Sequence, residues 1–556
     1  MKINIHRKKG NATGNGRGQF PGRLLSGAGI FAYIILLIMR LLLTDAIGDA
    51  GTGLFAPAFE IFFLASLVFA QGMSKTMGNL IRYRVKRQQY RNAKKVFSAG
   101  FAINLVFGLL MAVILLLTAD RIAQIVCLEE FSRLAVMAAA PAVVLTALTG
   151  AFRGCFSGYG IGRIGIYSQY LESILIAVFS VICGRAFRSY GVKVAGLLQR
   201  DAYIYLYDAL GAMLGVMLAE LVTLLFLMVF YILYAGTIKN SLQQDSGKRF
   251  EGTGEMQRIL LGGCLVNAGS FILPNLLLLL DQRFFNFCMN RTGQGEVRTA
   301  LWGASYGKAF ALLGIAAACL CLCAQNHVAR IGSAYDKEEY HMMRERMDKG
   351  IRKLCMLALP VAVYVAVLAQ AVATLLFKTQ AAYVASVLQK GSAVIALFGF
   401  SFFFGQLLIR FRMHRENLVS MLIAFLVHIL MLFLLVKNSL LGIEGILIAL
   451  ILFYGVYTVL SFLLLQRAQA YQINWMKSVV FPAVAAFVSG ILVLLLSRFL
   501  LDSAGALVTI LAGCVVGIFV DVILLMVLRV LTEEELLRMP LGTIFVLLGR
   551  NTGILR

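Results

Sequence analysis

Hydrophobic residues in this chain gather into long runs that are separated by short polar segments. A helical run of about 20 apolar residues crosses a hydrocarbon core of about 30 Å. We therefore predict an all-α polytopic membrane protein with about fourteen transmembrane helices. The expected spans are 24–43, 53–74, 96–118, 134–150, 164–184, 208–234, 259–281, 299–323, 354–377, 391–409, 418–436, 441–465, 479–497 and 505–528.

The composition agrees with a membrane protein. Of the 556 residues, 60% are hydrophobic and only 14% are charged, whereas about a quarter of the residues in a soluble domain are charged. The formal net charge is +24, but no polar stretch is long enough to form a basic soluble domain. We therefore expect no nucleic-acid partner. The Gly-Lys pairs at 247–248 and 307–308 lack the following Ser or Thr of a phosphate-binding P-loop, so no nucleotide is expected.

The sequence offers no set of metal ligands. Its ten cysteines are scattered, it has no Cys-x-x-Cys or His-Glu-x-x-His motif, and its five histidines are isolated. The loops expected on the far side from the termini are short, the longest being 185–207, so a large catalytic domain is absent from them. We predict no metal, no cofactor, no catalytic residues and no enzymatic activity.

Basic residues are distributed unevenly between the two sides of the predicted bundle. Loops on the side of both termini hold 35 Lys and Arg, and loops on the other side hold 13. Because Lys and Arg are enriched in cytoplasmic loops, both termini are expected in the cytoplasm. The segment 81–95, with seven basic residues, is mainly a determinant of this topology. Attraction of anionic membrane lipids to this segment is compatible with that role.

The two richest basic loops, 82–95 and 325–353, follow the second and the eighth spans. They coincide if the first six spans are overlaid on the next six, and internal repeats around a central site are common in transporters. We therefore predict two six-helix lobes and two extra C-terminal helices. The expected parts are a cytoplasmic basic tail 1–23, a first lobe 24–234, a cytoplasmic linker 235–258, a second lobe 259–465, an accessory pair 466–530 and a cytoplasmic C-terminal tail 531–556.

Ionisable residues inside the spans are the candidates for function, because each costs about 2.5–3.5 kcal/mol to insert. Arg40 and Glu60 are expected at similar depth on adjacent helices, either as cavity groups or as a structural ion pair. Lys75 and Lys308 are expected near the cytoplasmic half of their helices, where snorkelling to the interface is one interpretation. The full set is Arg40, Glu60, Lys75, Glu172, Glu220, Asp281, Lys308 and Asp521.

Several segments resemble a known family. The order GDAGTGLFAPAFEIFFLAS, MSK, QQYRNAKKVF and AAPAVVLTALTGAFRGCFSGYGIGRIGIYSQYLE resembles the stage V sporulation protein B-like branch of the multidrug, oligosaccharidyl-lipid and polysaccharide exporter superfamily, which is related to the lipid II flippases. The motif that joins Arg153-Gly154 to Ser168, Gln169 and Glu172 carries most of the likeness, and LTEEELLRMP at 531–540 resembles the family's C-terminal segment.

This resemblance implies two six-helix lobes that form a V around a central cavity in the bacterial cytoplasmic membrane. It also implies a flippase that moves an undecaprenyl-pyrophosphate-linked saccharide from the inner to the outer leaflet for polysaccharide or peptidoglycan synthesis. Arg40, Glu60, Arg153 and Lys308 are the expected substrate-binding residues. Glu172, Glu220 and Asp281 are expected to balance charge or to couple transport to a monovalent ion. The alternative is a MATE-like antiporter for organic cations, for which the first span lacks an acid.

Overall fold

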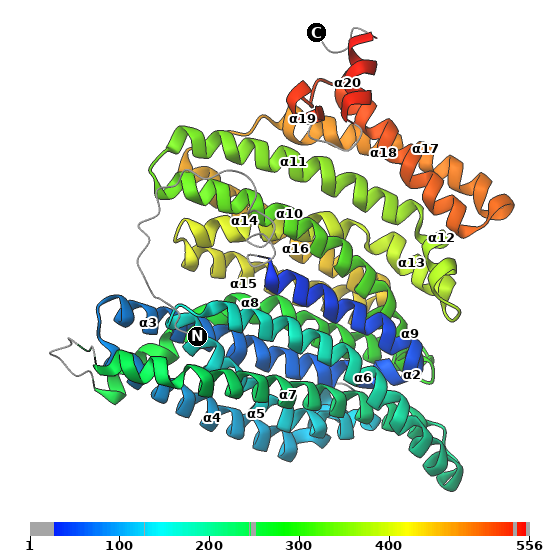
Figure 1. Cartoon of the computed structure of the whole chain (residues 1–556). Helices are drawn as coiled ribbons and strands as arrows, with labels where there is room; N and C mark the ends of the chain where they lie inside the picture. Colours follow the sequence, from blue (N-terminus) through cyan, green and yellow to red (C-terminus); the bar gives the residue numbers. More distant parts are fainter. Residues whose placement is uncertain (1–26, 127, 244, 246–251, 538–541, 552–556) are drawn as a thin grey trace.

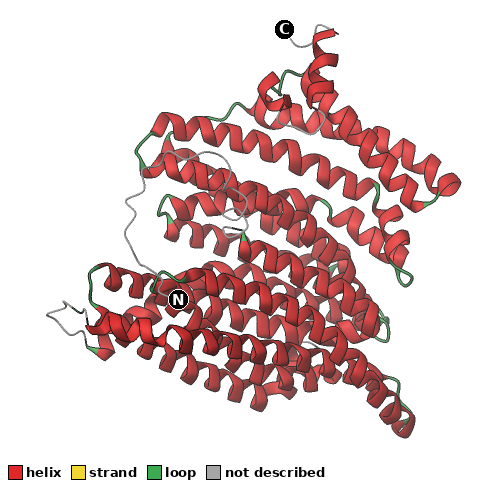
Figure 2. Cartoon of the chain, in the orientation of Figure 1, coloured by secondary structure: helices red, strands yellow, loops and turns green. Residues whose placement is uncertain are grey.

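The computed structural model describes residues 27–126, 128–243, 245, 252–537 and 542–551. All regular elements in these ranges are helices, and no strand occurs among them (Figure 2). The expected all-α membrane fold is confirmed. The expected N-terminal tail 1–23 lies outside the described residues.

By length and composition, twelve helices in the described ranges can cross a membrane, or up to thirteen if a bent pair counts as one span. The first of them, Ala28–Lys86, has 59 residues and would be about 88 Å long if straight, far more than the core requires. Gly48 interrupts it with φ 78° and ψ 171°. A side-chain hydrogen bond joins residues 40 and 60 across this break, so the chain reverses at Gly48. The expected count of about fourteen stays a prediction.

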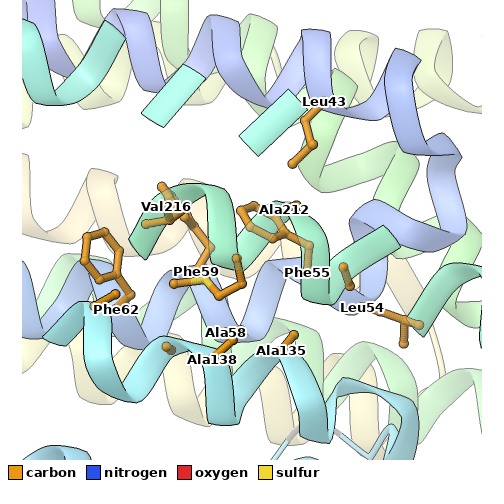
Figure 3. Packing of buried hydrophobic residues seen from close by; sticks show 14 of the residues in the cluster. Leu43, Leu54, Phe55, Ala58, Phe59, Phe62, Ala135, Ala138, Ala212 and Val216 are labelled. Atoms are coloured by element: carbon orange, nitrogen blue, oxygen red, sulfur yellow. The ribbon is translucent and has the colours of Figure 1, made fainter. Parts of the chain in front are cut away.

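The first half of the chain is a bundle around the reversed segment. It contains α2 (Ala28–Ser66), η1 (Leu67–Met73), α3 (Ser74–Lys86), α4 (Tyr90–Arg121), α5 (Arg133–Gly158), α6 (Gly162–Leu198) and α7 (Ala202–Gln243). In its core, Phe55 and Phe59 of α2 are fully buried against Ala138 of α5 and against Ala212 and Val216 of α7 (Figure 3). The small alanines leave room for the aromatic rings, so the three helices pack closely.

Helix α8 (Thr253–Arg291) is bent by 57° between Thr253–Gly269 and Ile272–Arg291. The bend lies about one turn before Pro274, whose ring displaces the carbonyl four residues earlier and removes its hydrogen bond. The first part of α8, Thr253–Gly269, contacts the first half of the chain, since Asn267 Nδ2 donates a 3.0 Å hydrogen bond to Thr76 Oγ1. Helix α8 therefore links the two halves of the chain.

The second half lies beside the first (Figure 1). Its elements are α9 (Arg298–Ala304), η4 (Ser305–Ala309), α10 (Phe310–Asp336), α11 (Tyr340–Val367), α12 (Ala369–Leu376), α13 (Ala381–Gly391), α14 (Ala393–Arg410), α15 (His414–Met431), η5 (Leu432–Asn438) and α16 (Gly442–Gln469). The segments η1, η4 and η5 are π-helical turns.

The C-terminal helices α17 (Phe481–Ala504) and α18 (Ala506–Val527) pack on the outer side of α11 (Figure 1). The Tyr364 hydroxyl of α11 and the Ser489 hydroxyl of α17 are 3.0 Å apart. In α19 (Glu533–Leu537), Glu535 Oε1 accepts a 2.7 Å hydrogen bond from Arg352 Nη2 and lies 3.6 Å from Lys353 Nζ. Burial opposes ionisation of Glu535, but the two cations hold its pKa below its usual range.

Two segments that were expected to be loops are largely helical. Helix α7 continues to Gln243 and α8 begins at Thr253, so the expected linker 235–258 is helical at both ends. The expected loop 185–207 is the tip of a helical hairpin formed by α6 and α7. Tyr190 and Tyr207 pack edge to face with their ring centroids 4.9 Å apart. Helix α6 has 37 residues, about 55 Å, and the hairpin extends past the other helices (Figure 1).

Candidate functional site

A cavity of about 700 Å³ lies between the two halves of the chain. Its lining comes from α2, η1, α3, α5 and α6 of the first half and from α8, α10, α14 and α16 of the second. It runs from the middle of the bundle to the helix ends beside the loops 87–89, 159–161 and 411–413, the side that we call the basic side. The wall is largely apolar, and its uncharged polar residues include Gln71, Ser74, Gln169, Asn275, Gln325 and Gln406.

Arg40 lines the deep part of this cavity and is 3% exposed. Its Nη2 lies 2.6 Å from Glu60 Oε1, which also accepts a 2.7 Å hydrogen bond from the Tyr306 hydroxyl. The guanidinium carbon stands 4.0 Å from the centre of the Tyr306 ring. The expected meeting of Arg40 and Glu60 is confirmed. Because Tyr306 belongs to the second half, this cluster joins the two halves.

Arg153 and Glu172 form a second buried ion pair in the cavity wall. Arg153 Nη2 contacts Glu172 Oε2, and Arg153 Nε donates a 2.8 Å hydrogen bond to Ser168 Oγ. The motif that spans residues 153–172 therefore folds into one cluster, in which a single guanidinium holds the end of α5 to the beginning of α6.

Glu220 of α7 lies behind this cluster and is completely buried. Its carboxylate is close to Glu172, Arg153 and Thr146. Neither of its oxygens makes a well-formed hydrogen bond within the described part of the chain. Two carboxylates thus share one arginine here, an arrangement in which a proton or a cation stabilises the second acid.

Lys75 also lines the cavity, at the beginning of α3, and its side chain is exposed there. Among the described residues, the Lys75 ammonium makes no ion pair and no hydrogen bond. Its charge is therefore available to the cavity, unlike that of Arg40 or Arg153.

Lys308 lies elsewhere. It does not line the cavity, and the expected placement in the cytoplasmic half of its helix is wrong. The Lys308 ammonium lies 2.6 Å from Asp49 Oδ1 and donates hydrogen bonds of 3.0 and 2.8 Å to the carbonyl and hydroxyl oxygens of Thr379. Since its side chain is 6% exposed, Lys308 does not snorkel. It holds α2 to the second half at the end of the pathway away from the basic side.

A second contact closes the same end. Glu129 Oε2 accepts hydrogen bonds from Arg298 Nη2 at 2.9 Å and from Thr299 Oγ1 at 2.7 Å. Between these contacts, a Cβ atom at Gly303 would collide with the Asp49 carbonyl, so only glycine permits this approach of α9 to α2. We call the set Asp49, Glu129, Arg298, Lys308 and Thr379 the far-side lock.

Asp281 of α8 is fully buried and pairs with His428 of α15, whose Nε2 lies 2.8 Å from Asp281 Oδ1. Asp281 is not part of the cavity wall. The pair lies behind it, near Phe453 and Tyr454 of α16, and Tyr454 does line the cavity. Within the described residues, no group of three or more His, Cys, Asp and Glu side chains converges as a metal site would require.

Residues 23–274 match the family described as "Polysaccharide biosynthesis protein". The chain is 23% identical over 336 residues to "Stage V sporulation protein B" from Bacillus subtilis (strain 168). That alignment covers 60% of this chain and 62% of the relative, so the chain spans less than two thirds of the relative's length.

Solved structures extend the likeness to most of the chain. An inward-facing multidrug resistance MATE family transporter of the MOP superfamily aligns with a TM-score of 0.59 at 16% identity, covering 81% of this chain and 94% of that one. The lipid II flippase MurJ, in an inward closed conformation, aligns with a TM-score of 0.63 at 12% identity, covering 90% and 97%. The chain has the fold of the MOP superfamily. The resemblance seen in the sequence is confirmed by the family match over residues 23–274 and by the similarity to stage V sporulation protein B.

Within this MOP fold, several polar residues near the cavity or the lock were not predicted from the sequence, among them Tyr306, His428 and Thr379. Tyr306 and His428 are 246 and 147 residues away from their partners Glu60 and Asp281, and no local pattern joins such residues. Thr379 is an ordinary loop residue by sequence. Lys75 was noted, but its neighbours gave no sign that its helix face turns toward the cavity.

Proposed function

We propose that this chain is a flippase for an anionic lipid-linked saccharide, with an undecaprenyl-pyrophosphate carrier as the expected substrate. The observation that supports this most is the charge of the cavity wall. Arg40, Lys75 and Arg153 line it, against Glu172 as the acidic lining residue. A pyrophosphate requires cationic donors, and the uncharged amides of the wall can bind sugar hydroxyls. The polyprenyl tail can remain in the lipid between the two halves.

In this proposal the protein lies in a bacterial cytoplasmic membrane with both termini in the cytoplasm, as the basic loops predict. The basic side of the cavity is then the cytoplasmic side, and the far-side lock closes the outer end. The conformation is inward-facing, ready to receive a headgroup from the inner leaflet. Opening of the lock together with closure of the basic side would deliver the headgroup to the outer leaflet, by alternating access of the predicted lobes 24–234 and 259–465.

Outward movement of an anion is favoured by an inside-negative membrane potential, by about 2.3 kcal/mol per charge for each 100 mV. Glu172 and Glu220 in the first half, and Asp281 in the second, are the proposed sites for a coupling proton or other monovalent ion. Each is a buried acid beside or behind the cavity wall.

A second candidate function is MATE-like antiport of an organic cation, which the similarity to a MATE transporter favours. A cation substrate requires an acidic cavity, so the excess of Arg and Lys in the wall argues against it.

The test is reconstitution of the full-length chain in liposomes with a lipid-linked oligosaccharide at an imposed potential. Transfer is measured as exposure of the sugar to an externally added glycosidase. We expect exposure with the wild type, loss with Arg40→Ala, and retention with Asp521→Asn, a buried acid of α18 outside the cavity. No exposure with the wild type, together with proton-coupled efflux of an organic cation, would establish the antiporter instead.

A further inference from the structure

We propose that Lys75 and Lys308 are two anion-binding stations at opposite ends of one pathway, and that only one of them is available at a time. The proposal deepens the proposed function, because it assumes that the substrate carries a phosphate or pyrophosphate headgroup. Neither lysine is assigned a role by the likeness to the MATE transporter or to MurJ, which concerns the fold.

The first station follows from the charges of the cavity. Arg40 is neutralised by Glu60, and Arg153 by Glu172. Lys75 is the lining cation that makes no ion pair and no hydrogen bond within the described ranges, and its side chain is exposed to the cavity. An arriving anion therefore meets the Lys75 ammonium without first breaking a buried ion pair, which costs several kcal/mol.

The second station follows from the construction of the far-side lock. Asp49 belongs to the first half of the chain, whereas Lys308 and Thr379 both belong to the second. When the two halves separate at this end, Lys308 loses its carboxylate and keeps the Thr379 oxygens. A cation that loses its partner in a poorly hydrated site needs a new one. A phosphate oxygen of the headgroup supplies it, so Asp49 is the internal competitor of the substrate.

A local feature of the backbone is common to the two lysines. The π-helical segment Leu67–Met73 ends two residues before Lys75, and the π-helical segment Ser305–Ala309 contains Lys308. Lys75 follows the predicted span 53–74, whereas Lys308 lies near the beginning of the corresponding span 299–323. The two lysines therefore mark opposite ends of two spans that coincide in the predicted overlay of the two lobes. π-helical turns occur frequently at functional sites, and here one stands beside each lysine.

The alternation follows from these contacts. With the lock closed, Lys75 faces the cavity and Lys308 is neutralised by Asp49. With the lock open, Lys308 is released while the basic side, and Lys75 with it, is closed. The headgroup would pass from one ammonium to the other, with Arg40 between them in the deep part of the cavity.

The test is acetylation footprinting of lysines in the purified full-length protein in detergent, with rates read by mass spectrometry. The two probes are inorganic pyrophosphate and farnesyl pyrophosphate. In the wild type we expect rapid acetylation of Lys75, slowed at least fivefold by either probe, and little acetylation of Lys308. In Asp49→Asn, Lys308 should become reactive and should also be protected by the probes. Exposed Lys477 of the η6 segment (Met476–Val480) is the internal control and should be unaffected.

Protection by farnesyl pyrophosphate at a far lower concentration than inorganic pyrophosphate would identify a lipid headgroup as the ligand, and equal protection would identify a free phosphate. The proposal is overturned if neither probe slows Lys75, or if Asp49→Asn exposes Lys308 without protection. Should Asp49→Asn fail to fold, Glu129→Gln weakens the other contact of the far-side lock between the two halves and should likewise raise both the reactivity of Lys308 and its protection by the probes.

The outcomes separate this proposal from the proposed function. Protection of both lysines without saccharide exposure in the liposome assay would retain the anion stations and reject the lipid-linked saccharide. Saccharide exposure without lysine protection would retain the lipid-linked saccharide as substrate and reject the anion stations.

Discussion

Arg40 and Glu60, twenty residues apart in the chain, form a buried ion pair with Nη2 and Oε1 separated by 2.6 Å. A straight helix would hold these residues about 30 Å apart, so the pair depends on the reversal at Gly48. Tyr306 completes the cluster from the other half of the chain by donating to the same carboxylate oxygen. Arg40 thus lines the cavity, and the pair with Tyr306 is also part of the packing that holds the two halves together.

Removal of one partner of this pair should be more harmful than removal of both. Arg40→Ala leaves the Glu60 charge buried without its cation, which typically costs about 3–5 kcal/mol. The double variant Arg40→Leu with Glu60→Leu removes both charges and should recover most of that stability, but not transport. Thermal unfolding in detergent measures the first effect, and saccharide exposure measures the second. Equal stability of the single and double variants would contradict the buried-pair account.

Arg153→Lys should reduce transport even though it keeps the charge. Arg153 contacts Ser168 through Nε and Glu172 through Nη2, and a single ammonium cannot reproduce this fork. Loss of one charged hydrogen bond of about 1.5 kcal/mol corresponds to about a tenfold lower initial rate of saccharide exposure. Arg163→Lys, an exposed position at the beginning of α6, is the matched control and should transport normally. A normal rate in Arg153→Lys would show that charge alone suffices.

His428→Ala should destabilise the second half of the chain. Asp281 Oδ1 would lose its imidazole partner in a site with no exposure, at a cost of about 1–3 kcal/mol. His428→Gln retains a side-chain donor and should lose less. The thermal unfolding midpoints of the two variants provide the comparison. A larger loss in His428→Gln than in His428→Ala would mean that the shape of the imidazole matters more than its hydrogen bond.

The contact between α19 and α11 should weaken in acid. Arg352 and Lys353 keep the pKa of Glu535 below its usual range despite partial burial. A depressed pKa in the folded state stabilises the contact above the ordinary Glu pKa, and this stabilisation is lost as the pH falls through the depressed value. The protection of amides 533–537 against hydrogen exchange, taken relative to the intrinsic exchange rate at each pH, should therefore fall at low pH.

The variant Glu535→Gln should show the reduced protection already at pH 7, with little further change in protection on acidification. Glu534→Gln, at an exposed neighbouring position, should behave as the wild type. Protection in Glu535→Gln that still depends strongly on pH would assign the effect to another group.

The membrane class and the helical architecture could be predicted from the sequence because apolar runs of spanning length are a local signal. The ends of the helices were less accessible to prediction. The polar segments 185–207 and 235–258 were expected to be loops, but α6, α7 and α8 continue into them. Helices that already pack side by side can be extended by local hydrogen bonds, and a hydropathy pattern does not record where this stops.

For the site, residues close in the chain were the predictable ones. Arg153, Ser168 and Glu172 lie within twenty residues of one another, and Arg40 and Glu60 lie on consecutive crossings, so a short motif or a single reversal brings them together. The depth and direction of Lys75 and Lys308 depend on which helix faces meet across the two halves. That arrangement is set by packing between segments far apart in sequence, such as those that bring Asp49, Lys308 and Thr379 into contact.

The hairpin of α6 and α7 is a long arm whose tip moves farther than its base when the first half of the chain rotates. Helix α6 is about 25 Å longer than the hydrocarbon core requires, and its tip is held to α7 by the edge-to-face contact of the Tyr190 and Tyr207 rings. A stiff arm of this length, continuous with the first half, moves at its end by about 4 Å for every 10° that the half rotates. A spectroscopic label on this arm would therefore magnify a rocking motion that is small at the cavity.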